Sequence, residues 1–246
     1  MPAHRFSLPG WTGPDPADPI VAIEGEEARH AARVKRLEPG EPVEVLSGEG
    51  LVGIGEVAGI ERVAKGAWRL LVRVERTEAH EPVRPMIEVC CAPPKGARFE
   101  EMVDQLSQVG AASWRALDCT RAGEKPPREG KLDRARRVAM EAAKQCGRAW
   151  TLRIDEPLRW REALAGDGGL KIVAADASGE GVRTLEGLRG AERVRLLVGP
   201  EGGWTPDELD EIRRAGAGVV RFGPHIMRIE TAAVVGCSGI LSVFGP

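Results

Sequence analysis

Short runs with the spacing of β-strands dominate the chain between residues 43 and 74. Trp68–Val74 alternates apolar and polar residues, and it follows two further strand-like runs, Val43–Val45 and Leu51–Val57. Glycine-containing turns separate the three runs, as between the strands of a β-sheet. Ahead of them, Glu26–Leu37 has helical spacing. These segments predict a small β-barrel or sandwich preceded by one helix.

The pattern changes near residue 80. Thr77–Pro85 contains prolines and charged residues and predicts a linker, so we place a domain boundary between residues 78 and 79. Beyond it strands alternate with helices, which is typical of an α/β domain. Nearly continuous apolar runs bounded by glycine indicate buried strands of a mostly parallel sheet. Strands are predicted at Met86–Ala92, Ala111–Leu117, Leu170–Asp176 and Val194–Val198, and helices at Phe99–Val109 and Lys131–Gln145.

Two strand ends in the last quarter of the chain share one plan. Leu196–Val198 and Val219–Phe222 both lead into a Gly-Pro turn and then into a helix start. We expect the two strand ends to lie side by side. Because ligands in open α/β sheets bind outside the carboxyl ends of strands, a binding site is expected there. One Gly-Pro alone is more often a plain tight turn, but the pair favours a site.

The first of these turns is the more informative. Thr205, Pro206 and Glu208 have the spacing of the N-cap, N1 and N3 positions of a capping box, so a helix begins there. Glu201 stands where a triphosphate-binding loop would carry lysine, and a carboxylate repels phosphate. The turn suits hydroxyls, amines or a cationic ligand instead, and Gly202–Gly203 allows another group to approach the backbone closely.

The amino-acid composition limits further the class of protein to which the chain can belong. The 246 residues include 35 basic and 37 acidic side chains, so the net charge is -2 and the chain has no overall excess of positive charge for binding nucleic acid. An RNA-binding protein of this composition must concentrate positive charge locally. The 5 cysteines lack CxxC spacing, which favours reduced thiols in the cytosol. The 4 histidines lack helical metal-pair spacing, and no signal peptide or bilayer-length apolar run is apparent. We expect a soluble, cytoplasmic protein without a metal.

The two C-terminal turns carry a specific resemblance. GPEGGW at 199–204, followed by TPDEL, and FGPHIMRIETAA at 222–233 resemble the signature of the ribosomal RNA small subunit methyltransferase E family, in the SPOUT superfamily. The resemblance extends over nearly the whole chain. Within the second motif three positions depart from the family pattern, because His225, Met227 and Ile229 replace an arginine, a leucine and a threonine, and the segments 105–110 and 119–123 depart from it as well. Supporting segments are Arg5-Phe6, Val34–Leu37, Pro39–Glu41, Pro94–Gly96, Arg98–Glu100 and Ala142–Arg148.

The resemblance implies a fold that periodicity alone does not reveal. It implies an α/β chain with a C-terminal SPOUT-type trefoil-knotted domain, residues 79–246, built on a mostly parallel sheet. It also implies an N-terminal PUA-like β-barrel domain, residues 1–78, that binds RNA. Members of the family are homodimers that use the last helix. Thr231–Leu241, with little charge and many small residues, fits such an interface, but burial in the core explains it equally well.

The implied activity is methylation of N3 of a specific uridine in 16S ribosomal RNA, free or within the small ribosomal subunit, with S-adenosyl-L-methionine as cofactor. The lack of a Ser/His/Asp or Cys/His motif agrees with catalysis by positioning. The implied cofactor-binding residues are Leu197, Val198, Gly199, Pro200, Glu201, Gly202, Gly203, Phe222, Gly223, Pro224, Ile226, Met227 and Arg228.

Basic residues outside the two turns are candidates for RNA contacts. Taken by themselves, the basic residues of Glu26–Leu37 indicate a solvated helix face. The resemblance implies instead that they form a surface that contacts RNA phosphates. The polar, proline-rich Thr120–Gly130 is either a connection without regular structure or a segment that grips RNA. The candidates are Arg5, Arg33, Lys35, Arg36, Lys95, Arg121 and Arg148.

Two residues are candidates for the chemistry itself. N3 of uridine is protonated, so a base or a cation that stabilises the anion must assist. Arg228 is the first candidate for that cation. Glu230 is a candidate base, but it is slightly more often a structural residue that pairs with Arg228 or begins the last helix. His225 has a side chain that can titrate near neutrality, although a lone histidine is more often a surface or packing residue.

Two other classes stay open beside the enzyme. A non-catalytic RNA-binding protein that keeps the SPOUT fold is made credible by the departures at positions 225, 227 and 229. A dinucleotide-dependent oxidoreductase is the weaker alternative, because no GxGxxG follows the early strand and no acidic residue is placed for a ribose.

Overall fold

The computed structural model describes residues 3–119, 121 and 126–245. Those residues form two compact units. The first consists of Met1–Glu81 together with Ala143–Thr151, and the second of Pro82–Ala142 together with Leu152–Pro246. The chain therefore leaves the second unit once, for nine residues that pack with the first, and returns to it.

A five-stranded sheet forms the centre of the first unit. Its strands lie in the order β1-β3-β4-β5-β2, with β1 parallel to β3 and the other pairs antiparallel. Phe6, Val43, Val45, Leu70 and Val72 are fully buried against one another, as the apolar positions of the strands predict. The strands are β1 (His4–Ser7), β2 (Ile20–Glu24), β3 (Pro42–Leu46), β4 (Leu51–Ala64) and β5 (Ala67–Ala79).

The helix expected over Glu26–Leu37 is present, but its second half is of another kind. α1 spans Gly25–His30, and a π-helical turn, η1, continues over Ala31–Lys35. The chain leaves η1 at Arg36 with a φ of 53°, in the left-handed region, and the Leu37 amide bonds back to the Ala31 carbonyl. Spacing alone does not distinguish the two helix types, because both place apolar residues on one face.

The linker expected at Thr77–Pro85 is shorter than predicted. Thr77 and Ala79 belong to β5, because they pair with Gly53 and Leu51 at the start of β4. This backbone pairing outweighs the polar composition of the segment. Within the predicted linker, only residues 80–85 lack regular structure.

A six-stranded, wholly parallel sheet forms the centre of the second unit. Its strands lie in the order β11-β9-β10-β6-β7-β8. Leu196 and Leu197 of the central strand are fully buried, which confirms the prediction of a parallel sheet covered on both faces. The strands are β6 (Met86–Cys91), β7 (Ser113–Asp118), β8 (Arg153–Arg159), β9 (Leu170–Gly181), β10 (Arg193–Val198) and β11 (Gly218–Arg221).

The order of the strands corrects one expectation. β10 and β11, which carry the two Gly-Pro turns, are not neighbours, because β9 lies between them and pairs with both. β9 is the longest strand of this sheet and bulges near Val219 and Val220 of β11, where the register shifts. All three strands are parallel, so their carboxyl ends meet at one edge of the sheet.

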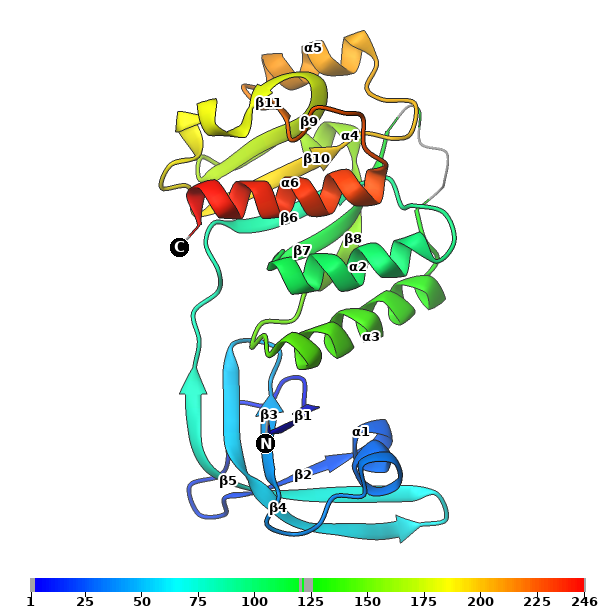
Figure 1. Ribbon diagram of the computed structural model, residues 1–246, viewed down its shortest axis with the longest axis vertical. Helices are drawn as coiled ribbons and strands as arrows, with labels where there is room; N and C mark the ends of the chain where they lie inside the picture. The colour runs from blue at the N-terminus through cyan, green and yellow to red at the C-terminus, as the bar shows by residue number, and fades with distance from the viewer. Residues whose placement is uncertain (1–2, 120, 122–125, 246) are drawn as a thin grey trace. The chain divides into compact units, whose positions relative to one another are not determined.

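Helices cover the sheet of the second unit. α6 crosses β6 and β10 and lies beside α2 (Figure 1). Ala233, Cys237 and Ile240 of α6 are fully buried, so part of its small-residue face belongs to the core. The helices are α2 (Arg98–Val109), α3 (Glu129–Cys146), α4 (Trp160–Ala163), α5 (Pro206–Arg214) and α6 (Ile229–Phe244), with short 3₁₀ turns η2 (Val182–Thr184) and η3 (Glu186–Leu188).

Three further predictions from the sequence can be compared with this fold. The irregular segment predicted at Thr120–Gly130 includes residues 120 and 122–125, which lie outside the described residues, and it ends earlier than predicted because α3 begins at Glu129. In the part of the chain that is described, no helix is both long and apolar enough to span a bilayer. The trefoil knot implied by the resemblance stays a prediction.

Candidate functional site

The loops that follow β10 and β11 line one cavity of about 520 Å³. Ala175–Ala177, in the middle of β9 where its pairing with β10 ends, form the wall between them, and the first turn of α6 closes one side. The two strands are therefore apart, but the two Gly-Pro turns meet across the edge of the sheet. The lining residues are Ala175, Asp176, Ala177, Val198, Gly199, Pro200, Glu201, Gly203, Trp204, Val220, Arg221, Phe222, Gly223, Pro224, His225, Ile226, Met227, Arg228, Ile229 and Ala232.

The predicted cofactor residues lie at this cavity with two exceptions. Leu197 is fully buried and packs beneath the turn with Cys90 and Ala174. Gly202 lies at the outer side of its turn, where its carbonyl faces Arg121. The β9 residues Ala175–Ala177 were not anticipated, and the strand predicted to end at Asp176 continues to Gly181. The rule that ligands bind at the carboxyl ends of strands applied to β9 as well, since Asp176 ends its predicted strand.

The capping box fixes where the first loop ends. The hydroxyl of Thr205 accepts a bond from the Glu208 amide at 3.1 Å, and the Glu208 carboxylate accepts one from the Thr205 amide at 2.8 Å. α5 begins at Pro206, as the sequence predicts. The helix start therefore holds the glycine-rich turn at its C-terminal end.

Trp204 anchors the same loop to the sheet. Its indole nitrogen donates to the Ala175 carbonyl at 3.0 Å, and its ring lies 5.2 Å from that of Trp160. A methyl group added at Gly199 would meet the Trp204 ring at 3.0 Å. Gly199 is therefore needed because the indole packs directly on the backbone of the turn, and this rigid contact shapes the cavity wall.

Arg121 lies on the outer side of the turn. Its guanidinium donates to the Gly202 carbonyl at 3.0 Å, and its aliphatic part would be 3.2 Å from a methyl group at Gly202. The sequence marked Arg121 as an RNA contact, whereas in this structure it bonds to the first Gly-Pro loop. No local pattern signals this bond, because the two residues are 81 positions apart.

The second loop combines one anchored residue with several exposed ones. Phe222 packs on α6 near Gly236 and Gly239, which would place a methyl group 3.3 and 3.2 Å from its ring. Ile226 is 92% exposed, and His225 and Arg228 are exposed as well. Arg228 is the N-cap residue of α6, and it forms no ion pair within the described residues. Its guanidinium is thus available to a ligand in the cavity.

Glu230 lies in the first turn of α6 and outside the cavity lining. Its carboxylate accepts a bond from Arg98 at 3.3 Å, and its side chain is 15% exposed. Of the alternatives that the sequence left open, the pairing with Arg228 is therefore wrong, and the start of the last helix is where Glu230 lies.

The remaining RNA-contact candidates occupy different surroundings. In the first unit, Arg5 donates to Glu44 at 2.7 Å and to the Lys144 carbonyl at 3.1 Å, so it holds Ala143–Thr151 in place. Lys35 lies 3.1 Å from the His4 ring nitrogen Nδ1 and over the ring of Phe6. Arg33, Arg36 and Lys95 are exposed, and Arg148 is half-buried.

The chemistry of the cavity follows from these groups. It offers backbone amides and carbonyls, apolar side chains, the carboxylates of Asp176 and Glu201, and the exposed guanidinium groups of Arg221 and Arg228. Within the described residues no three His, Cys, Asp or Glu side chains gather as a metal site would require. Such a lining can bind and orient a mostly apolar ligand that carries hydroxyls and a positive charge.

The chain is similar to proteins of one known family. A family model described as the RNA methyltransferase domain matches residues 81–241, and one described as the RNA methyltransferase PUA domain matches residues 23–63. The chain is 33% identical to the ribosomal RNA small subunit methyltransferase E of Mycobacterium bovis, over 91% of this chain and 87% of the relative. It is 31% identical to the protein of that name from Synechocystis, over 89% and 72%.

A solved structure shares the fold. The ribosomal RNA small subunit methyltransferase E of Neisseria gonorrhoeae, bound to S-adenosyl methionine, has a TM-score of 0.83 and 21% identity over 99% of this chain and 98% of the other. The fold is thus mixed α/β with a mostly parallel sheet and a PUA-like domain. On the family model and the Mycobacterium relative together, the chain belongs to the ribosomal RNA small subunit methyltransferase E family.

Proposed function

We propose that this protein methylates 16S ribosomal RNA with S-adenosyl-L-methionine, at N3 of a specific uridine. Membership of the family supports the enzyme class, and the cofactor bound in the Neisseria structure supports the methyl donor. The observation that carries the proposal is the meeting of the two Gly-Pro loops around one cavity. Without that meeting the two family motifs would have no common ligand.

The cavity fits the cofactor in size and chemistry. Its volume of about 520 Å³ lies within the range of roughly 300–1,000 Å³ that small-molecule sites occupy. Gly199 brings the backbone close to the cavity, and Met227 and Ile226 supply apolar surface for a base. We propose as cofactor-binding residues Val198, Gly199, Pro200, Glu201, Gly203, Phe222, Gly223, Pro224, Ile226, Met227 and Arg228, with Leu197 and Gly202 supporting the turn from outside the cavity.

The cofactor, when bound, supplies a methyl group on a sulfonium, which is electrophilic enough for direct displacement. The protein then has to orient donor and acceptor and to help the acceptor lose its proton. Glu201 accepts a bond from a ligand hydroxyl. Arg228, free and exposed beside the cavity, stabilises the uridine anion as N3 loses its proton.

Glu230 acts in this proposal as a positioning residue. Its ion pair with Arg98 holds the first turn of α6, and therefore the backbone that follows Arg228. A role as the base would require the Arg98 pair to open and the carboxylate to turn into the cavity. The pH dependence of a Glu230 variant separates the two roles, as described in the Discussion.

The PUA-like domain, residues 1–78, is proposed to bind RNA, and residues 79–246 to form the methyltransferase domain. Arg33 is exposed within the π-helical turn and Arg36 directly after it, and both suit phosphate contacts, as do Lys95 and, in part, Arg148. Arg5 and Lys35 support the domain from within, because their charged groups contact other residues of the first unit. Arg121 already donates a hydrogen bond to the Gly202 carbonyl, so an RNA contact would be a second role of this side chain.

The test is a mass map of methylated nucleotides after unmodified small subunits, or free 16S RNA, are incubated with the protein and the cofactor. We expect one added methyl group on N3 of one uridine. A methyl group on another atom would redirect the claim to that atom. Cofactor binding without transfer to either substrate would favour the non-catalytic alternative.

The assembly and location are part of the same proposal. We propose a homodimer that uses the exposed part of α6, where Val243 is 36% exposed, and action in the cytoplasm, where ribosomal subunits mature. Light scattering at micromolar concentration measures the mass in solution. A strict monomer would remove the dimer from the proposal and leave the chemistry untouched.

A further inference from the structure

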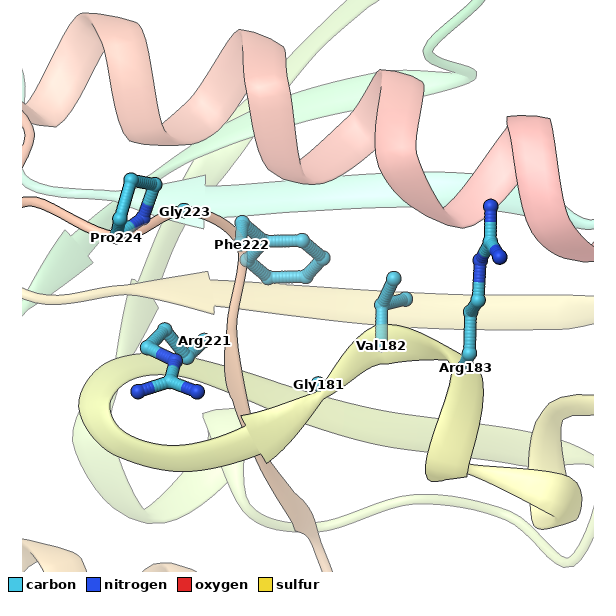
Figure 2. Close-up of a pocket in the computed structure, with 7 residues that line it drawn as sticks. All are labelled: Gly181, Val182, Arg183, Arg221, Phe222, Gly223 and Pro224. Carbon is cyan, nitrogen blue, oxygen red and sulfur yellow. The ribbon is translucent and has the colours of Figure 1, made fainter.

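A second hollow of about 520 Å³ lies outside the cofactor cavity, between the junction of β9 with η2 and the end of β11 with the loop that follows it (Figure 2). Gly181, Val182 and Arg183 line one side of it, and Arg221, Phe222, Gly223 and Pro224 line the other. The segment Arg221–Pro224 also lines the cofactor cavity. A ligand in this hollow would therefore lie directly next to the site of chemistry.

Two arginines give the hollow its charge. Arg183 and Arg221 are both exposed, and within the described residues neither guanidinium has a hydrogen bond or an ion pair. The neighbouring carboxylate of Glu180 bonds to the Thr184 hydroxyl at 3.0 Å. Two positive charges thus face solvent without an ion-pair partner within the described residues, in a chain whose net charge is -2. This is local concentration of positive charge, which the overall composition lacks.

The arrangement of the side chains narrows the kind of ligand. In Figure 2, Arg183 extends toward α6, Arg221 extends away from it, and the ring of Phe222 lies between them beside Val182. Two guanidinium groups that bind one phosphate would converge on a point. Guanidinium groups at opposite ends of an apolar floor suit a ligand with two separated anionic groups and a less polar part between them.

We propose that this hollow binds the sugar–phosphate backbone of the RNA strand beside the target nucleotide, with Arg183 and Arg221 on successive phosphates. The inference rests on the proposed function, because it takes the RNA to be the substrate whose reacting base enters the adjoining cavity. Contacts of this kind position a strand without reading its sequence. The hollow therefore sets the direction in which the strand enters the site.

The test uses the full-length protein and a fluorescent, unmodified fragment of 16S RNA, with binding measured without cofactor over a series of salt concentrations. Arg183→Gln and Arg221→Gln are each expected to weaken binding. Each is also expected to reduce the slope of log K against log salt by about 0.7, since one phosphate contact with single-stranded RNA is lost. Arg183→Lys should restore most of the salt dependence.

Arg214→Gln is the matched control, because Arg214 is exposed on α5, away from the hollow, and lacks an ion pair within the described residues. It should leave the salt slope unchanged. Arg183 does not line the cofactor cavity, so Arg183→Gln should keep the affinity for the cofactor, measured by calorimetry.

A wild-type salt slope in both glutamine variants would overturn the inference. A change in solution mass at unchanged RNA affinity would also overturn it, because the hollow would then face a second copy of the chain. Failure of the proposed function is a separate result. It appears as absence of methyl transfer by the wild-type protein, whatever the binding curves of the variants.

Discussion

Arg98 and Glu230 form an ion pair of 3.3 Å although 132 positions separate them in the sequence. Arg98 begins α2 and Glu230 lies in the first turn of α6, so the pair joins the starts of two neighbouring helices. A carboxylate in the first turn of a helix also interacts favourably with the helix dipole. The pair therefore fixes the point at which the second Gly-Pro loop enters α6.

Glu230→Gln is expected to lower methyl transfer only modestly and to leave the pH profile of kcat unchanged. The glutamine keeps a hydrogen-bond acceptor for Arg98, and a partly exposed pair of this type contributes about 1 kcal/mol at most. Rates across a pH series and a thermal melt measure both effects. Arg98→Gln should have a similar effect on the rate. Loss of the acidic limb of the profile, where the rate falls as a base becomes protonated, in Glu230→Gln alone would identify Glu230 as the base.

Arg228→Ala is expected to lower kcat by at least about 100-fold, the usual effect of removing one group that stabilises developing charge. The affinity for the cofactor should change little, because backbone groups of the two loops make most of the cavity. Single-turnover rates and calorimetry measure the two quantities. Arg214→Ala is the control for loss of an exposed arginine. Near-normal turnover would remove Arg228 from the mechanism.

Gly199→Ala is expected to weaken cofactor binding by about tenfold, which corresponds to roughly 1.4 kcal/mol. The added methyl group would meet the rigid Trp204 ring at 3.0 Å, so the turn has to shift. Gly223→Ala is the matched comparison. Its methyl group would meet the Met227 methyl at 2.7 Å, and that flexible chain end can move away. Equal affinities for the two variants would contradict the steric argument.

Trp204 is expected to report the cofactor by its fluorescence. It is 6% exposed, lines the cavity and packs against Trp160 in a tilted arrangement, so a ligand in the cavity changes its surroundings. A titration should alter the emission of the wild-type protein, and Trp204→Phe should lose most of that response. Trp160→Phe, which changes a ring outside the cavity lining, should keep it. The opposite pattern would place the ligand elsewhere.

Cys146 is expected to be the fast-reacting thiol under native conditions at pH 8, because it is exposed and the other four cysteines are buried. Burial raises the pKa of Cys91 and of Cys119 to about 12 and that of Cys90 well above its usual value. These thiols stay protonated until the pH approaches those values, and the thiol form is unreactive. Alkylation followed by peptide mass analysis counts the modified sites. Rapid loss of a second thiol would show that the core opens.

Local patterns in the sequence determined where most elements begin and what they are. The capping box at Thr205 and Glu208 needed only three residues of spacing, so the start of α5 was predictable. The apolar run at Val194–Val198 likewise predicted a buried parallel strand. A strand that is covered on both faces of a sheet needs apolar residues at nearly every position. The two Gly-Pro motifs also identified the family, since their residues are contiguous in the chain.

The tertiary structure alone decided which of these pieces meet. It placed β9 between β10 and β11, paired Glu230 with Arg98 instead of Arg228, and turned Arg121 onto Gly202 and Arg5 onto Glu44. Each of these partners lies tens of residues away, and many basic and acidic residues could have paired equally well by charge. Strand order and long-range ion pairs depend on how the whole chain packs, and no local spacing encodes that choice.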